Sequence, residues 1–161
     1  MGQIDARLAA LGLVLPPPMR LPPGVSLPFP WVRVNGDRAF VSGHGPLAPD
    51  GSLAKPLGKV GTDLTLEQGQ AAARLTGLAI LASLRLALGD LDRIAAWLRV
   101  FGMVNKGGDF DRFPAVINGF TDLILDVFGP DAGAHARSAV GMAGLPFGLP
   151  VEIEAEVRIK P

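Results

Sequence analysis

Residues 136–156 read Ala-Arg-Ser-Ala-Val-Gly-Met-Ala-Gly-Leu-Pro-Phe-Gly-Leu-Pro-Val-Glu-Ile-Glu-Ala-Glu. The pattern predicts two strands joined by a loop rich in glycine and proline. Arg137 stands at the head of the first strand and Glu152 near the head of the second. A guanidinium is always charged and binds a carboxylate through two N–H donors, and a carboxylate can take a proton from water or return one. This pair of residues suggests a site for a small acid.

Upstream, the N-terminal half predicts a β-hairpin followed by a helix. Strands are expected at residues 31–34 and 39–42, and Asn35-Gly36 between them is a strong turn signal, because both residues tolerate positive φ. Thr65-Leu66-Glu67-Gln68 has the form of a capping box. A helix should therefore begin there and end at Gly89.

A second helix has the clearest periodicity in the chain. Pro114 suits its first turn, and Gly129-Pro130 should stop it. Apolar residues at three- and four-residue steps form one stripe: Phe113, Val116, Ile117, Phe120, Leu123, Ile124 and Val127. With a strand over 94–104 between the helices, the order is β-β-α-β-α-β-β. This order predicts one α+β domain over residues 1–161, a mixed sheet with two crossover helices on one face.

The strand over 94–104 is predicted to be apolar on both faces. Alternation places Ile94, Leu98, Val100 and Val104 on one face and Trp97, Phe101 and Met103 on the other. Two helices cover only one face of a sheet, so the second face needs another cover. An exposed apolar patch of that size is typical of an interface. The sequence therefore predicts self-association.

Residues 1–28 are expected to extend this domain. A short amphipathic helix is predicted from four spaced apolar residues, Ile4, Leu8, Leu11 and Leu13. Pro16-Pro17-Pro18 and Pro22-Pro23 then predict a stiff, extended linker.

Composition argues against several classes of protein. The 161 residues carry 15 basic and 15 acidic side chains without a basic block, so the electrostatic footprint of a nucleic-acid-binding protein is missing. The chain has no cysteine, which fits a reducing compartment, and a cytoplasmic protein is expected. The most apolar stretch, residues 75–88, is too short to span a bilayer and contains Arg85, so no membrane partner is expected.

No metal or cofactor site is expected either. His44 and His135 are the two histidines of the chain, and neither has an acidic or histidine partner at ligand spacing. Gly43-His44-Gly45-Pro46 does not match the dinucleotide-binding pattern, and Gly58-Lys59-Val60 lacks the Ser or Thr of a phosphate-binding loop.

Four stretches, in this order, resemble the YjgF/RidA family of reactive intermediate deaminases, also called the endoribonuclease L-PSP family. They are Phe40-Val41-Ser42-Gly43, Gly89-Asp90-Leu91-Asp92-Arg93, Val116-Ile117-Asn118-Gly119-Phe120 and residues 136–156. The resemblance runs from about Val32 to the C-terminus. It implies a chorismate-mutase-like fold and a homotrimer with its sites in clefts between subunits.

The resemblance also implies roles for individual residues. Arg137 would bind the substrate carboxylate, Glu152 would orient and deprotonate a water molecule, and Asn118 would hydrogen-bond the substrate. Ser42 and Gly43 would offer backbone groups to the ligand. Each residue has a structural alternative: an inter-subunit ion pair for Arg137, a solvated surface for Glu152 and Asn118, and a turn requirement for Gly43.

Two positions depart from the family pattern. Active deaminases of this type carry a Tyr before the first strand, and this chain has no Tyr. Phe29 lies nearest that position, with Pro28 as the alternative; Phe keeps the ring and loses the hydroxyl. Ala139 stands where the family has a Cys, a milder change if the backbone carbonyl is the group that serves the site.

Two functional hypotheses follow. The first is an enzyme that hydrolyses reactive enamines or imines of the 2-aminoacrylate type to 2-keto acids and ammonia; the imine carbon is already electrophilic, so a bound water and a proton carrier suffice. The second is a non-catalytic protein that binds small carboxylates such as 2-keto acids in the same cleft. An endoribonuclease is the least favoured, because the charge is neutral and no basic and aromatic surface is evident.

Overall fold

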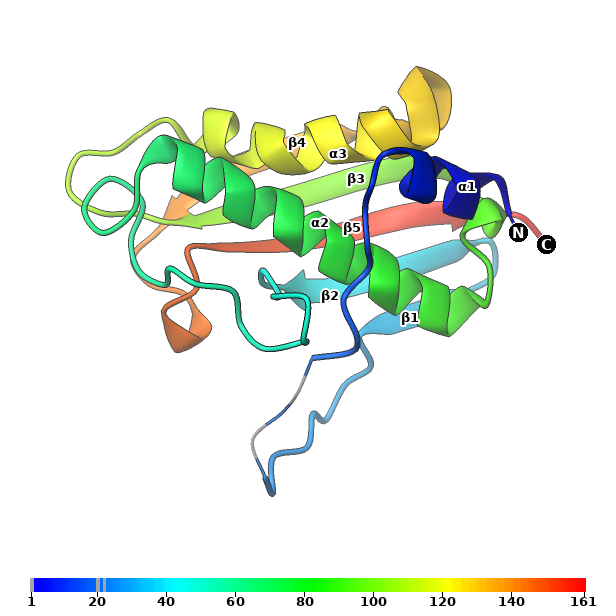
Figure 1. The fold of residues 1–161 in the computed structure, drawn as a ribbon, viewed down its shortest axis with the longest axis horizontal. Coiled ribbons are helices and arrows are strands. Elements are labelled where there is room, and N and C mark those ends of the chain that lie inside the picture. Colours follow the sequence, from blue (N-terminus) through cyan, green and yellow to red (C-terminus); the bar gives the residue numbers. More distant parts are fainter. Residues whose placement is uncertain (1, 20, 22) are drawn as a thin grey trace.

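Five strands form one mixed sheet in the order β1-β2-β5-β3-β4 (Figure 1). The computed structural model describes residues 2–19, 21 and 23–161. β3 and β4 pair in parallel, and the other neighbouring strands pair antiparallel. The strands are β1 (Val32–Asn35), β2 (Arg38–His44), β3 (Ile94–Asn105), β4 (Ala136–Met142) and β5 (Val151–Ile159). The predicted α+β class and the predicted order of elements are confirmed.

Two long helices lie side by side on one face of the sheet (Figure 1), as the sequence predicts. The first, α2 (Leu66–Leu88), begins with the expected capping box: Gln68 N–H donates to Thr65 Oγ1 at 3.2 Å, and Thr65 N–H donates to Gln68 Oε1 at 2.8 Å. It ends at Gly89, which has a φ of 80°. A 3₁₀ turn, η1 (Leu91–Arg93), then leads into β3.

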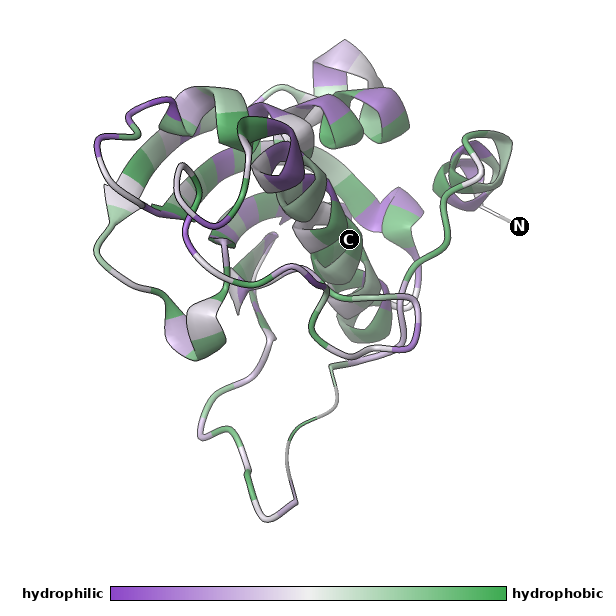
Figure 2. Cartoon of the chain, turned by 60° about the vertical axis from the view of Figure 1, so that its left-hand side comes forward, coloured by the Kyte–Doolittle hydropathy of each residue, from purple (hydrophilic) through white to green (hydrophobic). Residues whose placement is uncertain are grey.

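Helix α2 is long and apolar enough to pass a length-and-composition test for a membrane span, and most of its ribbon is green in Figure 2. In the folded chain 56% of that apolar window is buried. The buried residues pack against α3 and the sheet. The hydrophobic effect of the core therefore accounts for the apolar character of α2.

Helix α3 (Phe113–Gly133) has Pro114 in its first turn, and its predicted apolar stripe faces the core. Gly129 has φ 74° and ψ 174°, which are not helical values. The regular helix is therefore interrupted at the predicted position, and one further turn that contains Pro130 leads to β4.

Two irregularities in β3 overturn part of the predicted pattern. The register with β5 shifts between Ile94 and Ala96 and again between Trp97 and Arg99. Each shift is the mark of a bulge, which changes the side on which the following residues lie. Trp97 consequently packs among the helices, with its ring centroid 5.7 Å from Phe120, and it is 2% exposed. Its predicted place on the open face with Phe101 and Met103 is wrong.

The N-terminal extension begins with the predicted helix, α1 (Gln3–Ala10). The backbone N–H groups of Gln3 and Ile4 donate to the carboxylate of Asp92, at 2.6 and 2.7 Å. Asp5 pairs with Arg85 of α2. The following proline segment passes along the outer side of α2, and Pro22 of the predicted linker lies outside the described residues.

The first hairpin turns one residue later than the sequence pattern indicates. Asn35 pairs with Arg38 at the end of the ladder, so Gly36 and Asp37 form the loop. Gly36 has a φ of 62°, which only glycine adopts without cost.

Candidate functional site

Arg137 lies on β4, at one edge of the sheet, and its side chain extends over α3. One of its terminal nitrogens, Nη1, donates to Asn118 Oδ1 and to Thr121 Oγ1, each at 2.9 Å. The other, Nη2, donates to the carbonyl of Pro114 at 3.3 Å. Since β4 pairs with β3 so that Arg137 sits beside the fully buried Val100, its side chain lies on the helix side of the sheet.

Two N–H donors of Arg137 have no hydrogen-bond partner among the described residues. A guanidinium has five N–H donors in a fixed fork, and three of them are used within the chain. The Nε–H and one Nη2–H have no acceptor among the described residues. Among the described residues no carboxylate forms an ion pair with Arg137, and burial lowers the pKa of its guanidinium, opposed by the charge of Asp122. The site is a partly desolvated cation with two donors free for a ligand.

Thr121 is the residue that sequence reasoning missed. Its hydroxyl accepts from Arg137 and lies 3.1 Å from Nε2 of His135. Nδ1 of His135 lies 2.7 Å from the carbonyl of Gly133, which can only accept, so Nδ1 carries the proton. Thr121 therefore donates to Nε2 of a neutral His135. The available signal was spacing, because Thr121 is one turn beyond Asn118 and shares its side of the helix.

Glu152 lies on β5, on the open side of the sheet, where its register partner is Met103. It is half-buried, and burial first, then the charge of Glu154, raises the pKa of its carboxyl above the usual range. A carboxyl whose pKa is raised in this way holds a proton more readily than an ordinary glutamate, which suits a group that takes a proton and returns it.

A bulge in β2 brings Gly43 against Glu152. Val41 pairs with Ala155 and His44 with Ile153, so Ser42 and Gly43 together face one residue of β5. A methyl group on Gly43 would overlap Glu152 Oε1 and lie 3.0 Å from its Cδ. Ser42 is held from the other side, because its hydroxyl donates to the carbonyl of Pro30 at 2.9 Å. Glycine at 43 is thus required by close approach, not by a positive φ.

Within one chain the predicted residues form two groups that do not meet. Arg137 and Asn118 lie on the helix side at the β4 edge, whereas Glu152 and Gly43 lie on the open side. β5 and β3 separate β2 from β4, a distance of about 14 Å at ordinary strand spacing. One small ligand cannot contact both groups of the same chain.

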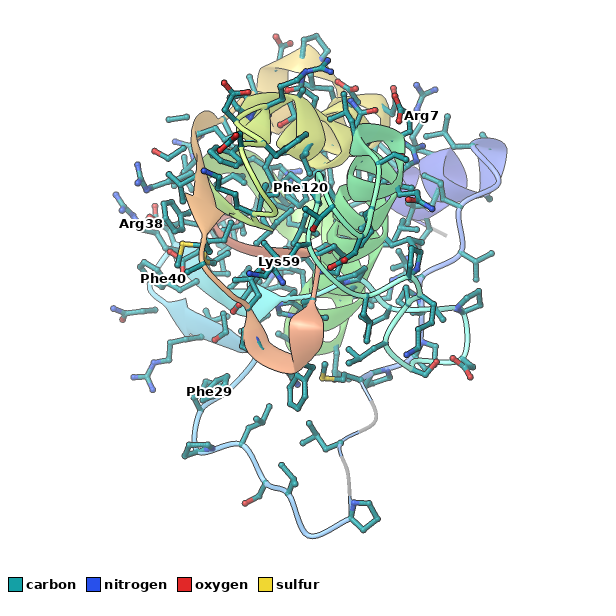
Figure 3. The ribbon with its side chains drawn as sticks, turned by 90° about the vertical axis from the view of Figure 1, so that its left-hand side faces the viewer. Arg7, Phe29, Arg38, Phe40, Lys59 and Phe120 are labelled. Carbon is teal, nitrogen blue, oxygen red and sulfur yellow. The ribbon has the colours of Figure 1, made fainter. Side chains whose placement is uncertain are left out.

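Phe29 and Ala139 take up separate positions. Phe29 precedes β1, at the edge of the sheet opposite to Arg137, is 47% exposed and packs edge-on against Trp31 at 6.0 Å. Figure 3 shows Phe29 on the loop away from the core, whereas Phe120 lies between the layers. Ala139, on β4, is packed against the core.

No group of three histidine, aspartate or glutamate side chains that could hold a metal ion is found among the described residues. The chemistry offered is therefore that of a cation with free donors and a carboxyl whose pKa is raised.

Comparison with known proteins places this geometry in a family. The family model described as YjgF/chorismate mutase-like, putative endoribonuclease, matches residues 5–149. The chain belongs to the YjgF family. A curated relative, protein TCP17 of Trypanosoma cruzi, is 39% identical over 158 residues, which are 98% of this chain and 95% of that protein.

Solved structures agree with the YjgF assignment. The protein Atu1372 of Agrobacterium tumefaciens, described as having unknown function, matches with a TM-score of 0.86 at 38% identity, over 98% of this chain and 93% of that one. A putative endoribonuclease of Shewanella oneidensis MR-1 also matches with a TM-score of 0.86, at 30% identity, over 98% of this chain and 100% of that one. Both matches extend across the proline-rich extension, so the extension is shared with these YjgF-like structures.

Proposed function

We propose that this YjgF-family protein hydrolyses small imines that carry a carboxylate to 2-keto acids and ammonia. The observation that carries the proposal is the state of Arg137. Its Nη1 is fixed by Asn118 and Thr121, no carboxylate pairs with it among the described residues, and two donors are left free. Two parallel N–H donors are the arrangement that binds a carboxylate bidentately.

The reaction needs a water molecule and a proton carrier. The water oxygen adds to the carbon of the protonated imine while Glu152 takes one of the water protons, which gives a neutral carbinolamine. Glu152 then returns that proton to the nitrogen. The C–N bond breaks and ammonia leaves, while Glu152 takes the remaining hydroxyl proton as the keto carbonyl forms and afterwards releases it to solvent. The raised pKa of Glu152 suits both directions of proton transfer.

The site is proposed to be shared between subunits of a homotrimer. Arg137 of one subunit and Glu152 of its neighbour would meet if the open face of one sheet packed beside the β4 edge of the next. That open face carries part-exposed Phe101 and Met103 and the 41% exposed Phe40. Such a surface is typical of an interface between copies. Light scattering at micromolar concentration should report three chains, and a clean monomer would refute the shared site.

A deamination assay tests the activity. A dehydratase generates 2-aminoacrylate in solution, and release of the keto acid is followed with and without this protein. Arg137→Lys should cut the acceleration by at least about tenfold, because a point charge cannot replace the fork. Glu152→Gln should cut it by about 10²-fold, the range for a positioned acid–base group, while calorimetric affinity for a 2-keto acid holds.

Two matched controls separate chemistry from folding. Glu156→Gln makes the same change four residues along β5, where the side chain pairs with Arg38, and Arg33→Lys makes the same change on the exposed part of β1. Both should retain full acceleration. If the controls lose as much activity as the test variants, or if the test variants lose none, the assignment of Arg137 and Glu152 is wrong.

A non-catalytic carboxylate-binding protein is the second candidate. The absence of Tyr from the whole chain favours it, because Phe29 offers no hydroxyl. In that case the wild type shows no acceleration, and Glu152→Gln holds or tightens keto-acid binding by removing a negative charge near the anion. Phe29→Tyr should raise the acceleration only if residue 29 reaches the site of a neighbouring subunit.

A further inference from the structure

A cavity lies far from Arg137, at the opposite edge of the sheet. It occupies about 220 Å³ between the proline segment of the extension, the start of β1 and the outer side of α2. Residues that bound it include Pro18, Trp31, His44, Ala82, Ser83 and Leu86. Its place on the helix side of the sheet separates it from Glu152, which lies on the open side.

The cavity is apolar and carries no charge on its described walls. None of its described lining residues is Asp, Glu, Lys or Arg. His44 is 5% exposed, and burial lowers its pKa to about 4, against a smaller opposing effect of its hydrogen bond with Ser42, so its ring is neutral at physiological pH. A charged ligand would lose its hydration here and find no counter-charge among the described lining residues.

The hydrogen bonds of His44 fix the direction in which the Ser83 hydroxyl donates, and they leave its oxygen able to accept a hydrogen bond. Nδ1 lies 2.6 Å from the carbonyl of Ser42, which can only accept, so Nδ1 carries the proton. Nε2, 2.8 Å from Ser83 Oγ, must then accept the proton of the Ser83 hydroxyl. The Ser83 oxygen has lone pairs that no described residue engages, so it can accept a hydrogen bond from a ligand.

The volume of the cavity limits the size of the ligand that it can hold. Apolar cavities of roughly 150 Å³ hold a benzene ring, so about 220 Å³ suits a molecule of one or two fused rings. Trp31 supplies an aromatic wall, since its ring centroid lies 4.8 Å from that of His44. Aromatic rings gain from stacked and edge-on contacts of this kind.

We infer that this cavity is a binding site for a neutral, ring-sized apolar molecule that bears one N–H or O–H donor. The Ser83 oxygen accepts the hydrogen bond from that donor. The site is independent of the proposed deaminase activity, because it shares no residue with Arg137 or Glu152. It differs in ligand class as well, since the proposed substrate is a carboxylate.

Nuclear magnetic resonance of the full ¹⁵N-labelled chain tests the inference, with indole as the probe. The chain has two tryptophans: Trp31 lines the cavity, and Trp97 lies in the core. Titration with indole to millimolar concentration should shift the side-chain N–H signal of Trp31 in a saturable way and leave that of Trp97 in place. Benzothiophene, which has the same shape without the donor, should bind about tenfold more weakly, the worth of one hydrogen bond. Indole-2-carboxylate should bind still more weakly.

Variants locate the binding. Ala82→Phe fills the cavity from α2 and should abolish the Trp31 shift, whereas Ala71→Phe, exposed on the same helix, should leave it intact. Leu86 is 75% exposed at the mouth, so Leu86→Ser should leave the fold intact and should weaken binding by at least about threefold through lost apolar contact. The inference is overturned if indole causes no saturable shift, if Leu86→Ser binds as the wild type does, or if the carboxylate binds as tightly as indole.

Discussion

The contact between Gly43 and Glu152 allows a sharp test of the proposed chemistry, through Gly43→Ala. The φ of Gly43 lies outside the region that only glycine adopts, so alanine can take the same backbone conformation. The added methyl would overlap Oε1 and lie 3.0 and 3.1 Å from Cδ and Cγ of Glu152. All three atoms belong to a flexible side chain, which can swing away at small cost in stability.

The expected effect follows from that displacement. To reach ordinary van der Waals separation the carboxylate must move by about 1 Å, and a misplacement of that size can cost about 10²-fold in rate. The dehydratase-coupled assay should therefore show a loss of about 10²-fold for Gly43→Ala. Calorimetric affinity for a 2-keto acid should change little, because Arg137 is not disturbed. The melting temperature should stay within a few degrees of the wild type.

Gly144→Ala is the matched control. Gly144 also has a φ that alanine tolerates, and a methyl there would meet nothing within 4 Å. It should retain full activity. The reasoning is refuted if a folded Gly43→Ala protein keeps wild-type turnover, or if Gly144→Ala loses as much.

Three further predictions concern stability. Burial lowers the pKa of His44 from 6.5 to about 4. The free energy of unfolding should therefore fall by about 3 kcal/mol as the pH drops from 6.5 to 4. When urea denaturation is measured at several pH values, the His44→Gln variant should not show this fall. Burial and Glu154 raise the pKa of Glu152, so ionisation costs stability as the pH rises. In thermal unfolding, Glu152→Gln should therefore be more stable than the wild type at pH 7, and this gain should shrink in acid as the Glu152 carboxyl becomes protonated; an equal gain at neutral and acidic pH would contradict this. A methyl on Gly102 would lie 2.6 Å from Cγ1 and 2.7 Å from Cδ1 of Ile117, so Gly102→Ala should cost about 1–3 kcal/mol by overpacking. Adding Ile117→Val, which removes Cδ1, should recover part of it.

Much of this fold depends on interactions between residues that are close together in the sequence, and the sequence alone predicts that part. The capping box at Thr65, the φ-positive Gly89 and the interruption at Gly129 mark where the helices begin and end through interactions within a few residues. The apolar stripe of α3 likewise depends only on the helical period. The alternation of β5 predicts that Glu152 lies on the side opposite the core, and the structure agrees.

The relative places of the site residues are not local, and tertiary structure decides them. Trp97 reaches the core because two register shifts against β5 change the side that β3 presents, and a bulge depends on the partner strand as well as on the strand itself. Arg137 is held by Thr121 because α3 happens to pass above β4. Arg137 and Glu152, 15 positions apart in the printed sequence, project from opposite faces of the sheet, because strand order and pleat, not chain distance, determine which side chains meet.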